Sequence, residues 1–229
     1  MVVNFSPNAV SDQEVVIWTY NDPRRNPAPG TLNSSHHLPK EGTKTVIVDL
    51  ATELYYNARD GTLMRIFPIL GELKRAVSRD ITKSDGWPKQ GNDVAMWKEL
   101  CRLLKKAMRQ VEIAAAVHFR RNEDQESIVL VAGAGVWFTA VLLTRNELLD
   151  SKEYQLPAEG LVDMFEREAG WFDEEDVLPN IGEWEAVLNE ASVSPKWTTP
   201  CGLDTPRADE MWEKIRVEHD KIAALFNNI

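Results

Sequence analysis

The longest run of patterned hydrophobic positions in the chain extends from Asp93 to Thr144 and predicts the centre of the fold. In its first half, apolar residues recur at spacings of three and four, which is the spacing of one face of an α-helix. Asn92 or Asp93 can accept hydrogen bonds from the first free backbone N–H groups, so the helix is predicted to begin there. The apolar positions of this helix are Val94, Trp97, Leu100, Cys101, Leu104, Ala107, Met108, Val111, Ala114 and Ala115.

An almost unbroken apolar run of 16 residues, 128–143, follows the helix. It is shorter than the about 18 residues that a membrane span needs. β-Branched and aromatic residues on both sides of Gly133 and Gly135 predict two buried strands joined by a tight turn. The same glycines resemble the start of the dinucleotide-binding fingerprint of Rossmann-type dehydrogenases, but Phe138 occupies the position of the third glycine. A dinucleotide-binding enzyme is therefore the third functional alternative.

Shorter patterns on both sides of this central stretch predict the remaining elements. The long segment 22–43 contains four prolines and is expected to be an irregular loop. Pro68 should bend or shorten the helix predicted around it, because proline has no N–H to donate. Periodicity predicts helices at 51–57, 62–79, 160–169, 181–190 and 208–226.

These patterns predict an α+β fold, with a small mixed β-sheet around one long central helix. Residues 1–229 are expected to form a single helix-rich domain, in which the acidic, helical part 151–229 packs on the core. A chain of this length can bury a core without staples, and two cysteines, Cys101 and Cys201, do not make a disulfide framework. The strands of the sheet are expected at 14–20, 45–49, 128–132 and 136–144.

Charge is distributed unevenly along the chain. The net charge is −10 overall, but it is +6 for residues 60–121 and −15 for residues 122–229. A basic stripe lies on the predicted central helix, opposite its apolar face. Such a stripe is most often a solvated helix face, and the functional alternative is a surface for phosphates or for an acidic partner. The stripe consists of Lys98, Arg102, Lys105 and Arg109.

Motifs of common catalytic chemistry are missing from the sequence. It contains no phosphate-binding loop of the Walker type, no Gly-x-Ser-x-Gly, no His-Glu-x-x-His and no Cys-x-x-Cys. His36 and His37 are adjacent, but no third ligand lies at a spacing typical of metal sites. His118, at the buried end of the central helix, is expected to be structural. Neither a metal nor a cofactor is predicted.

One class of enzymes fits the predicted order of elements. Strands, helices and a hairpin around a mixed sheet, with a basic helix beside it, resemble the restriction-endonuclease-like nucleases. The resemblance implies a metal held by an Asp at one strand end and by Glu-x-Lys on the next strand. The carboxylates near predicted strand ends are Asp22, Asp49 and Glu53, and no Glu-x-Lys is expected on a strand. Such an active site would therefore be degenerate or rearranged, and Asp49 can equally cap the helix predicted at 51–57.

The sequence favours a soluble, non-catalytic protein-interaction protein inside the cell, in the cytoplasm or the nucleus. The chain starts without the basic and apolar segments of a signal peptide. Its eight tryptophans and its strongly charged surfaces support a protein partner, and no membrane is expected to be one. The alternative is a nucleic-acid-binding or nuclease-like protein. It would bind nucleic acid through the basic stripe, with Asp49 and Glu53 as the candidate catalytic residues.

Overall fold

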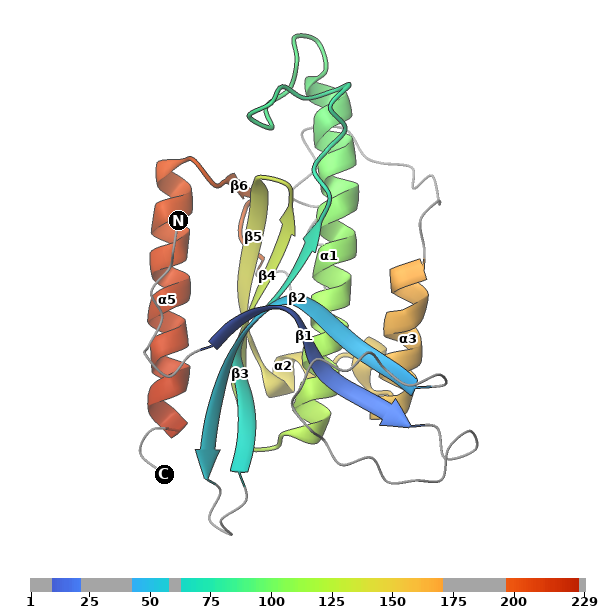
Figure 1. Cartoon of the computed structure of the whole chain (residues 1–229), viewed down its shortest axis with the longest axis vertical. Helices are drawn as coiled ribbons and strands as arrows, with labels where there is room; N and C mark the ends of the chain where they lie inside the picture. Colours follow the sequence, from blue (N-terminus) through green and yellow to red (C-terminus); the bar gives the residue numbers. More distant parts are fainter. Residues whose placement is uncertain (1–9, 22–42, 58–62, 171–196, 227–229) are drawn as a thin grey trace.

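A computed structural model of the chain describes residues 10–21, 43–57, 63–170 and 197–226. The described strands form one mixed sheet in the order β1 to β6, and helices cover both of its faces (Figure 1). The predicted α+β class and the long central helix are confirmed. Within the described residues, no helix combines the length and the apolarity that crossing a membrane requires.

Three strands form an antiparallel meander at one side of the sheet. They are β1 (Val10–Asn21), β2 (Thr43–Asn57) and β3 (Leu63–Lys74). The register between β2 and β3 shifts at Pro68, because two residues of β3 lie opposite one residue of β2 there. A bulge of this kind tolerates a proline, since the ladder is already interrupted at that point.

The long helix α1 (Asp93–Arg121) connects β3 to β4 (Ser127–Ala134), and these two strands are parallel. α1 is the crossover that a parallel pair requires. β5 (Trp137–Thr144) then returns antiparallel to β4, and the two-residue strand β6 (Cys201–Gly202) pairs with the start of β5. The meander and the hairpin are therefore joined through the single parallel pair of β3 with β4.

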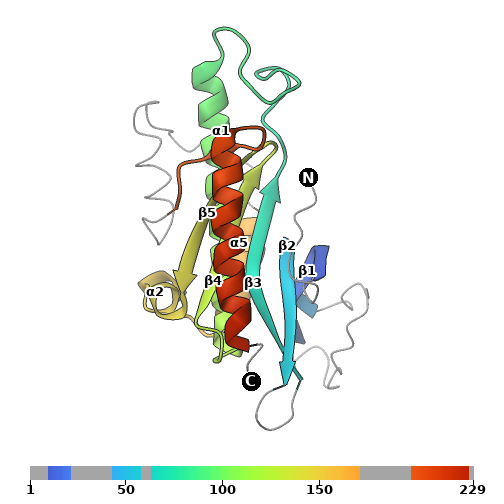
Figure 2. The same cartoon turned by 90° about the vertical axis from the view of Figure 1, so that its left-hand side faces the viewer.

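The helices lie on opposite faces of the sheet. α1 and α3 (Ala158–Gly170) lie side by side on one face, where the short helices α2 (Arg145–Leu149) and η1 (Lys152–Tyr154) connect β5 to α3 (Figure 1). α5 (Pro206–Phe226) runs along the other face (Figure 2). The helices predicted at 160–169 and 208–226 are thus confirmed, whereas the helix predicted at 181–190 and the loop predicted at 22–43 lie outside the described residues.

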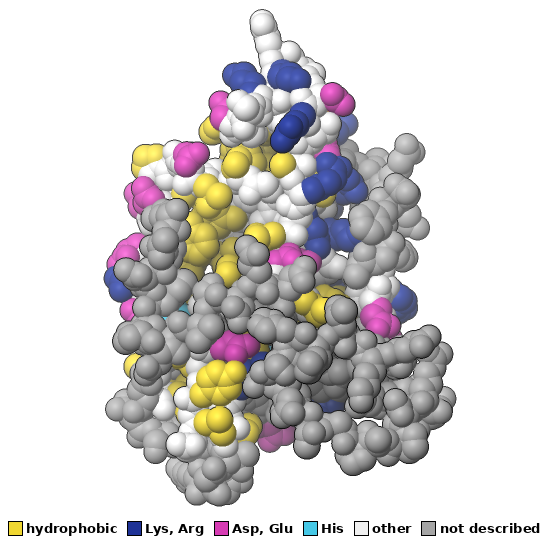
Figure 3. Space-filling model, in the orientation of Figure 1, with side chains coloured by type: hydrophobic (Ala, Val, Ile, Leu, Met, Phe, Trp, Pro, Cys, Tyr) yellow, Lys and Arg dark blue, Asp and Glu magenta, His cyan; other side chains and the backbone are white. Residues whose placement is uncertain are grey.

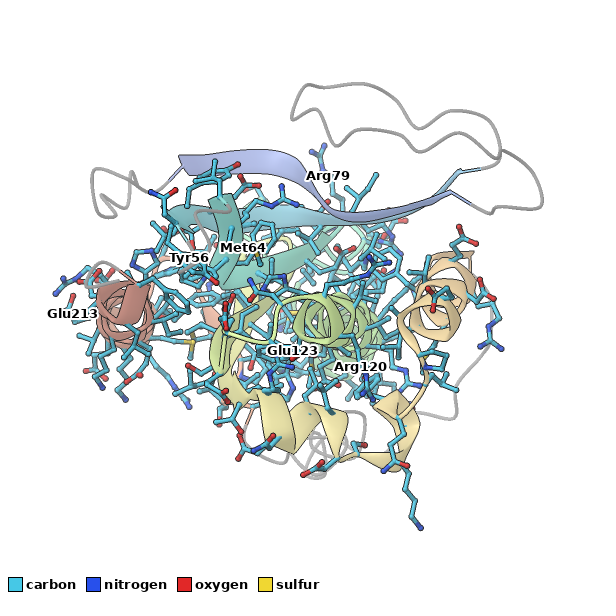
Figure 4. All side chains as sticks on the ribbon, turned by 90° about the horizontal axis from the view of Figure 1, so that it is seen from below. Tyr56, Met64, Arg79, Arg120, Glu123 and Glu213 are labelled. Carbon is cyan, nitrogen blue, oxygen red and sulfur yellow. The ribbon has the colours of Figure 1, made fainter. Side chains whose placement is uncertain are left out.

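Two apolar clusters fill the two faces of the sheet. The larger cluster surrounds α1, whose residues 113–117 are buried on every side, as the local sequence predicts. The smaller cluster lies under α5, where Met211, Ile215 and Ile222 pack on the strands. Figure 4 shows Tyr56 and Met64 between α5 and the rest of the sheet, and the ring centroid of Tyr56 lies 4.9 Å from that of Phe226.

Two helices predicted from the sequence are wrong. Residues 51–57 continue β2, and most of the segment 62–79 forms β3. β3 lies in the middle of the sheet, and all its residues from 66 to 72 are buried. A strand that is covered on both faces has apolar residues at nearly every position. Apolar residues three and four positions apart, such as Ile66, Leu70 and Leu73, therefore occur in this strand without a helix.

The predicted hairpin is confirmed, and its glycines explain the turn. β4 and β5 pair from Ser127–Thr144 to Ala134–Trp137, which leaves Gly135 and Val136 as the turn. Gly135 has a φ of 59°, a conformation that residues with a side chain rarely adopt. Gly133 lies inside β4. These glycines are therefore not at a strand-to-helix turn, and the resemblance to the dinucleotide-binding fingerprint is not borne out.

We expect the substitution Gly135→Ala to destabilise the fold more than Gly91→Ala does. Both glycines have positive φ, so each alanine should cost about 1–2 kcal/mol of unfolding free energy from backbone strain. A Cβ on Gly135 would lie 2.8 Å from Cα of Ala76, whereas a Cβ on Gly91 would have nothing within 4 Å. This clash should add roughly 1–3 kcal/mol. Urea unfolding measures both values, and equal losses would contradict the close approach of the hairpin turn to the end of β3.

Candidate functional site

β2 and β3 stop pairing part-way along their length, and charged side chains lie at the point of separation. Their pairing ends at Leu50 and Gly71, although both strands continue. The first half of β2 remains paired with β1, whereas the end of β3 remains paired with β4. Figure 1 shows the first half of β2 turning to the right while β3 continues upward. We call this place, formed by residues 48–50 and 71–74, the strand fork.

At the strand fork, where β2 and β3 no longer form backbone hydrogen bonds with each other, side chains bond to backbone groups instead. The carboxylate of Asp49 accepts a hydrogen bond from the backbone N–H of Leu73, with an O–N distance of 2.7 Å. The negative charge of Asp49 also lies close enough to Glu72 to raise the pKa of the Glu72 carboxylate. The ammonium of Lys74 forms an ion pair with Oε1 of the same carboxylate. Asp49, Glu72 and Lys74 are thus brought together from two neighbouring strands.

Glu72 is a buried carboxylate that its surroundings do not fully satisfy. Its residue exposure is 7%, and its Oε2 atom has no hydrogen-bond partner. Burial raises the pKa of Glu72 to about 6; the ion pair with Lys74 opposes this shift, and the nearby charge of Asp49 adds to it. A buried acceptor without a partner costs about 1–3 kcal/mol. Such an atom is expected where a ligand supplies the missing interaction.

Glu72-Leu73-Lys74 is a Glu-x-Lys sequence at the end of a strand, which corrects the expectation that none would occur. Local patterns do not reveal it, because the apolar spacing of the segment 62–79 predicts a helix there. Leu70 belongs to the apolar cluster around α1, and side chains two residues apart in a strand share a face. Glu72 and Lys74 therefore project from the face of the sheet that α1 covers.

The two predicted catalytic carboxylates, Asp49 and Glu53, are not brought together. Asp49 lies at the strand fork, where the predicted helix cap is excluded because β2 continues through residues 51–57. Glu53 lies further along β2, where its carboxylate accepts from the hydroxyl of Tyr55 at 2.7 Å and pairs with Arg65 at 3.2 Å. These contacts give Glu53 a structural role. The carboxylate whose charge is close to Asp49 at the strand fork is Glu72.

The basic stripe lies on the accessible side of α1. Lys98 is exposed, and Arg102, Lys105 and Arg109 are half-buried. Arg109 forms an ion pair with Glu153, which is one contact between the basic middle and the acidic C-terminal part of the chain. Among the described residues, no carboxylate lies within 4.0 Å of the other three cations. Within the described residues, ion pairing of the stripe with carboxylates is therefore confined to its Arg109 end.

The ion pair between Arg75 and Glu99 holds the Lys98 end of the basic stripe near the strand fork. Arg75, the residue after β3, pairs with Glu99 of α1 at 2.6 Å, and Glu99 also accepts from the backbone N–H of Ser78. Lys98 and Arg102 lie within one helical turn of Glu99. Residues 74–109 contain ten Lys or Arg and four Asp or Glu. Figure 3 shows basic side chains gathered over the upper part of the molecule, around the connection from β3 to α1.

Burial also changes the pKa of two side chains on α1, His118 and Cys101. The ring of His118 is buried and contacts Oε1 of Gln125 at 2.7 Å, and burial lowers the pKa of this imidazole to about 4. Burial raises the pKa of Cys101 to about 11, so its thiol is protonated at neutral pH. Cys101 and Cys201 are both free and buried. His36 and His37 lie outside the described residues.

Comparison of the chain with protein-family models, with characterised proteins and with solved structures finds no match. Among the described residues, no group of three or more His, Cys, Asp or Glu side chains is arranged to hold a metal. A metal at the strand fork would have two carboxylates from the protein, Asp49 and Glu72.

We expect Glu72→Gln to stabilise the protein at pH 8. The pKa of Glu72 in the folded protein, about 6, is above the usual 4.5, so the stabilisation from its protonated form is complete below pH 4.5 and is lost as the pH rises through 6. The amide avoids this loss, which is roughly 1–2 kcal/mol of unfolding free energy. Urea unfolding from pH 4 to 8 measures the difference between the two proteins.

The matched control for this experiment is Glu53→Gln. Because Glu53 has Tyr55 and Arg65 as partners, its substitution should not stabilise the fold at any pH. A Glu72→Gln protein less stable than the wild type at pH 8 would show that the carboxylate of Glu72 is a structural group in a favourable ion pair.

Proposed function

We propose that this chain binds a divalent cation at the strand fork and hydrolyses phosphodiester bonds in nucleic acid. The observation that carries the proposal is the convergence of Asp49 with the Glu72-x-Lys74 sequence on two neighbouring strands. An Asp on one strand and Glu-x-Lys on the next is what the resemblance to restriction-endonuclease-like nucleases implies. The meander, the crossover helix and the parallel strand β4 agree with the mixed sheet of that resemblance.

The donor set of the strand fork fits magnesium or manganese. Mg²⁺ is usually held by one or two carboxylates, with waters and substrate phosphates as the remaining ligands. Oε2 of Glu72 has no partner within the described protein and is buried, as a ligand atom awaiting a cation would be. When bound, the cation would polarise the phosphate and activate a water molecule. Asp49 and Glu72 are the residues that would hold it.

Lys74 has a different role in the proposal. Its ammonium neutralises Glu72 in the present arrangement. A cation on Glu72 would replace that charge, and the ammonium would then be free to donate to a phosphate oxygen of the substrate. Lys98, Arg102 and Lys105 would hold the neighbouring phosphates and orient the strand. The net charge of −10 makes this local basic region necessary, because the rest of the protein repels nucleic acid.

We expect the wild-type protein to bind Mn²⁺ in calorimetric titrations and to cleave single-stranded or duplex DNA when Mg²⁺ or Mn²⁺ is present. Asp49→Asn and Glu72→Gln should each weaken metal binding by about tenfold or more, because each removes one of two charged ligands. Lys74→Met should retain metal binding, since it removes a competing cation. Its cleavage rate should fall about 100-fold or more, because it loses a donor to the phosphate.

Glu123→Gln is the control for these substitutions. Glu123 is an exposed carboxylate just beyond the C-terminal end of α1, at the opposite end of that helix from Arg75 (Figure 4). Its removal should change neither metal binding nor cleavage. Wild-type protein that binds no metal, or Asp49→Asn and Glu72→Gln proteins that bind it as well as the wild type does, would overturn the proposal.

Replacement of Lys98, Arg102 and Lys105 together by alanine should weaken nucleic-acid binding. The probe is a fluorescent 15-nucleotide DNA with EDTA present, single-stranded or duplex, whichever the wild type binds more tightly. Each phosphate contact contributes about 0.7–0.9 to the slope of log Kd against log salt concentration. The triple variant should therefore lose about 2 from this slope. Triple replacement of Arg207, Lys214 and Lys221 on α5 removes equal charge from the other face, and the same loss there would contradict a specific role of the stripe.

A non-catalytic interaction protein, favoured by the sequence, is the second candidate function. One observation favours it: Asp49 and Glu72 already have partners at the strand fork, namely the N–H of Leu73 and the ammonium of Lys74. If these contacts persist in solution, the site is degenerate. The distinguishing result is a wild-type protein that is folded and binds a nucleic acid or a protein, but shows neither metal binding nor cleavage.

A further inference from the structure

The connection from β3 to α1, residues 75–92, forms an ordered projection beyond the end of the sheet. Figures 1 and 2 show it above the tip of β3 from two directions. Backbone hydrogen bonds fold it on itself: Lys83 N–H donates to Trp87 O at 2.8 Å, and Lys89 N–H donates to Ile81 O at 2.9 Å. The projection is therefore held in one shape by its own backbone, and we call it the β3–α1 loop.

Three tryptophans fix this loop to the body of the protein. Trp87 of the loop and Trp97 of α1 each contact Trp137 edge to face, with ring centroids 5.0 Å apart. The indole N–H of Trp137 donates to the backbone carbonyl of Gly86 at 3.3 Å. A Cβ on Gly86 would lie 2.4 Å from a methyl group of Val136, so the loop backbone is also packed closely against the β4–β5 turn.

Despite this anchoring, Trp87 is 44% exposed. An indole presented to solvent by a rigid loop can stack on another ring with little loss of conformational entropy. The side chains of Arg79 and Lys83 are also exposed, and the neighbouring Asp85 accepts a hydrogen bond from the N–H of Trp87 at 3.1 Å. Figure 4 shows Arg79 pointing away from α1, on the side of the molecule where β1 and β2 lie. The loop thus presents a partly exposed indole together with exposed cations, among them Arg79 and Lys83, and the exposed carboxylates of Asp80 and Asp85.

We propose that the β3–α1 loop binds single-stranded nucleic acid, with one unpaired base stacked on Trp87 and the adjacent phosphates on Arg79 and Lys83. This inference rests on the proposed function and specifies its substrate as a single strand. An aromatic side chain together with cations is the combination that binds single strands without sequence preference. In a duplex, both faces of each internal base are covered by neighbouring bases. Trp87 could therefore not stack on a duplex without unstacking it.

Because of its position, the loop would hold a base stacked on Trp87 close to the strand fork. The loop begins immediately after Lys74, and the pair of Arg75 with Glu99 fixes its start to α1. A strand whose base lies on Trp87 would continue past Arg75 and Lys98 towards Lys74. Binding by the loop and cleavage at the strand fork are therefore separate steps that act on one strand.

The experiment measures binding of a fluorescent dT15 strand to the full chain by anisotropy, with EDTA present so that no cleavage occurs. Wild-type protein should bind dT15 at least about tenfold more tightly than a 15-base-pair duplex. Trp87→Ala should weaken dT15 binding by about tenfold, and Trp87→Phe should retain most of the affinity because it keeps an aromatic face. Lys83→Ala should reduce the slope of log Kd against log salt concentration by about 0.7.

Leu225→Ala is the control for loss of an exposed apolar side chain, because Leu225 is exposed on α5. It should not change the affinity for dT15. Thermal unfolding of each variant establishes that it is folded, and Trp87→Phe keeps the test decisive if Trp87→Ala does not fold. Equal binding of dT15 by wild-type and Trp87→Ala proteins, weaker binding by Trp87→Phe than by Trp87→Ala, or equal binding of duplex and single strand would overturn the inference.

The two proposals fail in distinguishable ways. Asp49→Asn and Glu72→Gln proteins should bind dT15 as the wild type does in EDTA, because the loop does not include the strand fork. If the wild type binds dT15 through Trp87 but neither binds metal nor cleaves, the proposed hydrolysis is wrong and the loop assignment stands. If the wild type binds metal and cleaves duplex DNA independently of Trp87, the loop assignment is wrong and the hydrolysis stands.

Discussion

Burial of one helix layer, formed by α1 and α3 side by side on one face of the sheet, is the constraint on which the rest of the structure depends. α1 is apolar on all sides in its second half, so it must be covered by the sheet, by α3 and by the α2–η1 segment together. β3 and β4 pack against α1, whereas β2 packs against α3. The sheet covers both helices with strands that diverge between them. The strand fork is the place where they diverge, and the unpaired backbone groups there bond to side chains.

The strand fork also carries an energetic conflict. Glu72 is held in a buried position where its charged form is disfavoured, and one of its oxygen atoms has no partner. A sequence selected for stability alone would place an apolar or amide side chain at this position. Such conflicts are expected where function requires a charged group, and the stability lost there is supplied by the packed core.

How much of this could be predicted from the sequence depended on the environment of each element. α1 could be predicted because it has one polar face for much of its length, and the β4–β5 hairpin because Gly135 interrupts a β-rich run. β3 could not, because a strand buried on both faces lacks the period of two that identifies half-exposed strands. Because the spacing in the segment 62–79 predicts a helix, the position of Glu72-x-Lys74 at the end of a strand could not be predicted. Asp49 was found as an acid near a strand end, but its partnership with Glu72 depends on pairing between strands, which local patterns do not contain.

A buried carboxylate in the second half of α1, that of Glu112, links three segments of the chain during local unfolding. Glu112 is fully buried and accepts hydrogen bonds from the hydroxyl of Tyr154 at 2.9 Å and from the indole N–H of Trp197 at 2.8 Å. Departure of either partner would remove a hydrogen bond from a fully buried carboxylate, which is costly. The three segments that meet at Glu112 are thereby coupled energetically. Slow amide exchange should appear in all of them together, as one cooperative unit, while the β3–α1 loop exchanges independently of it.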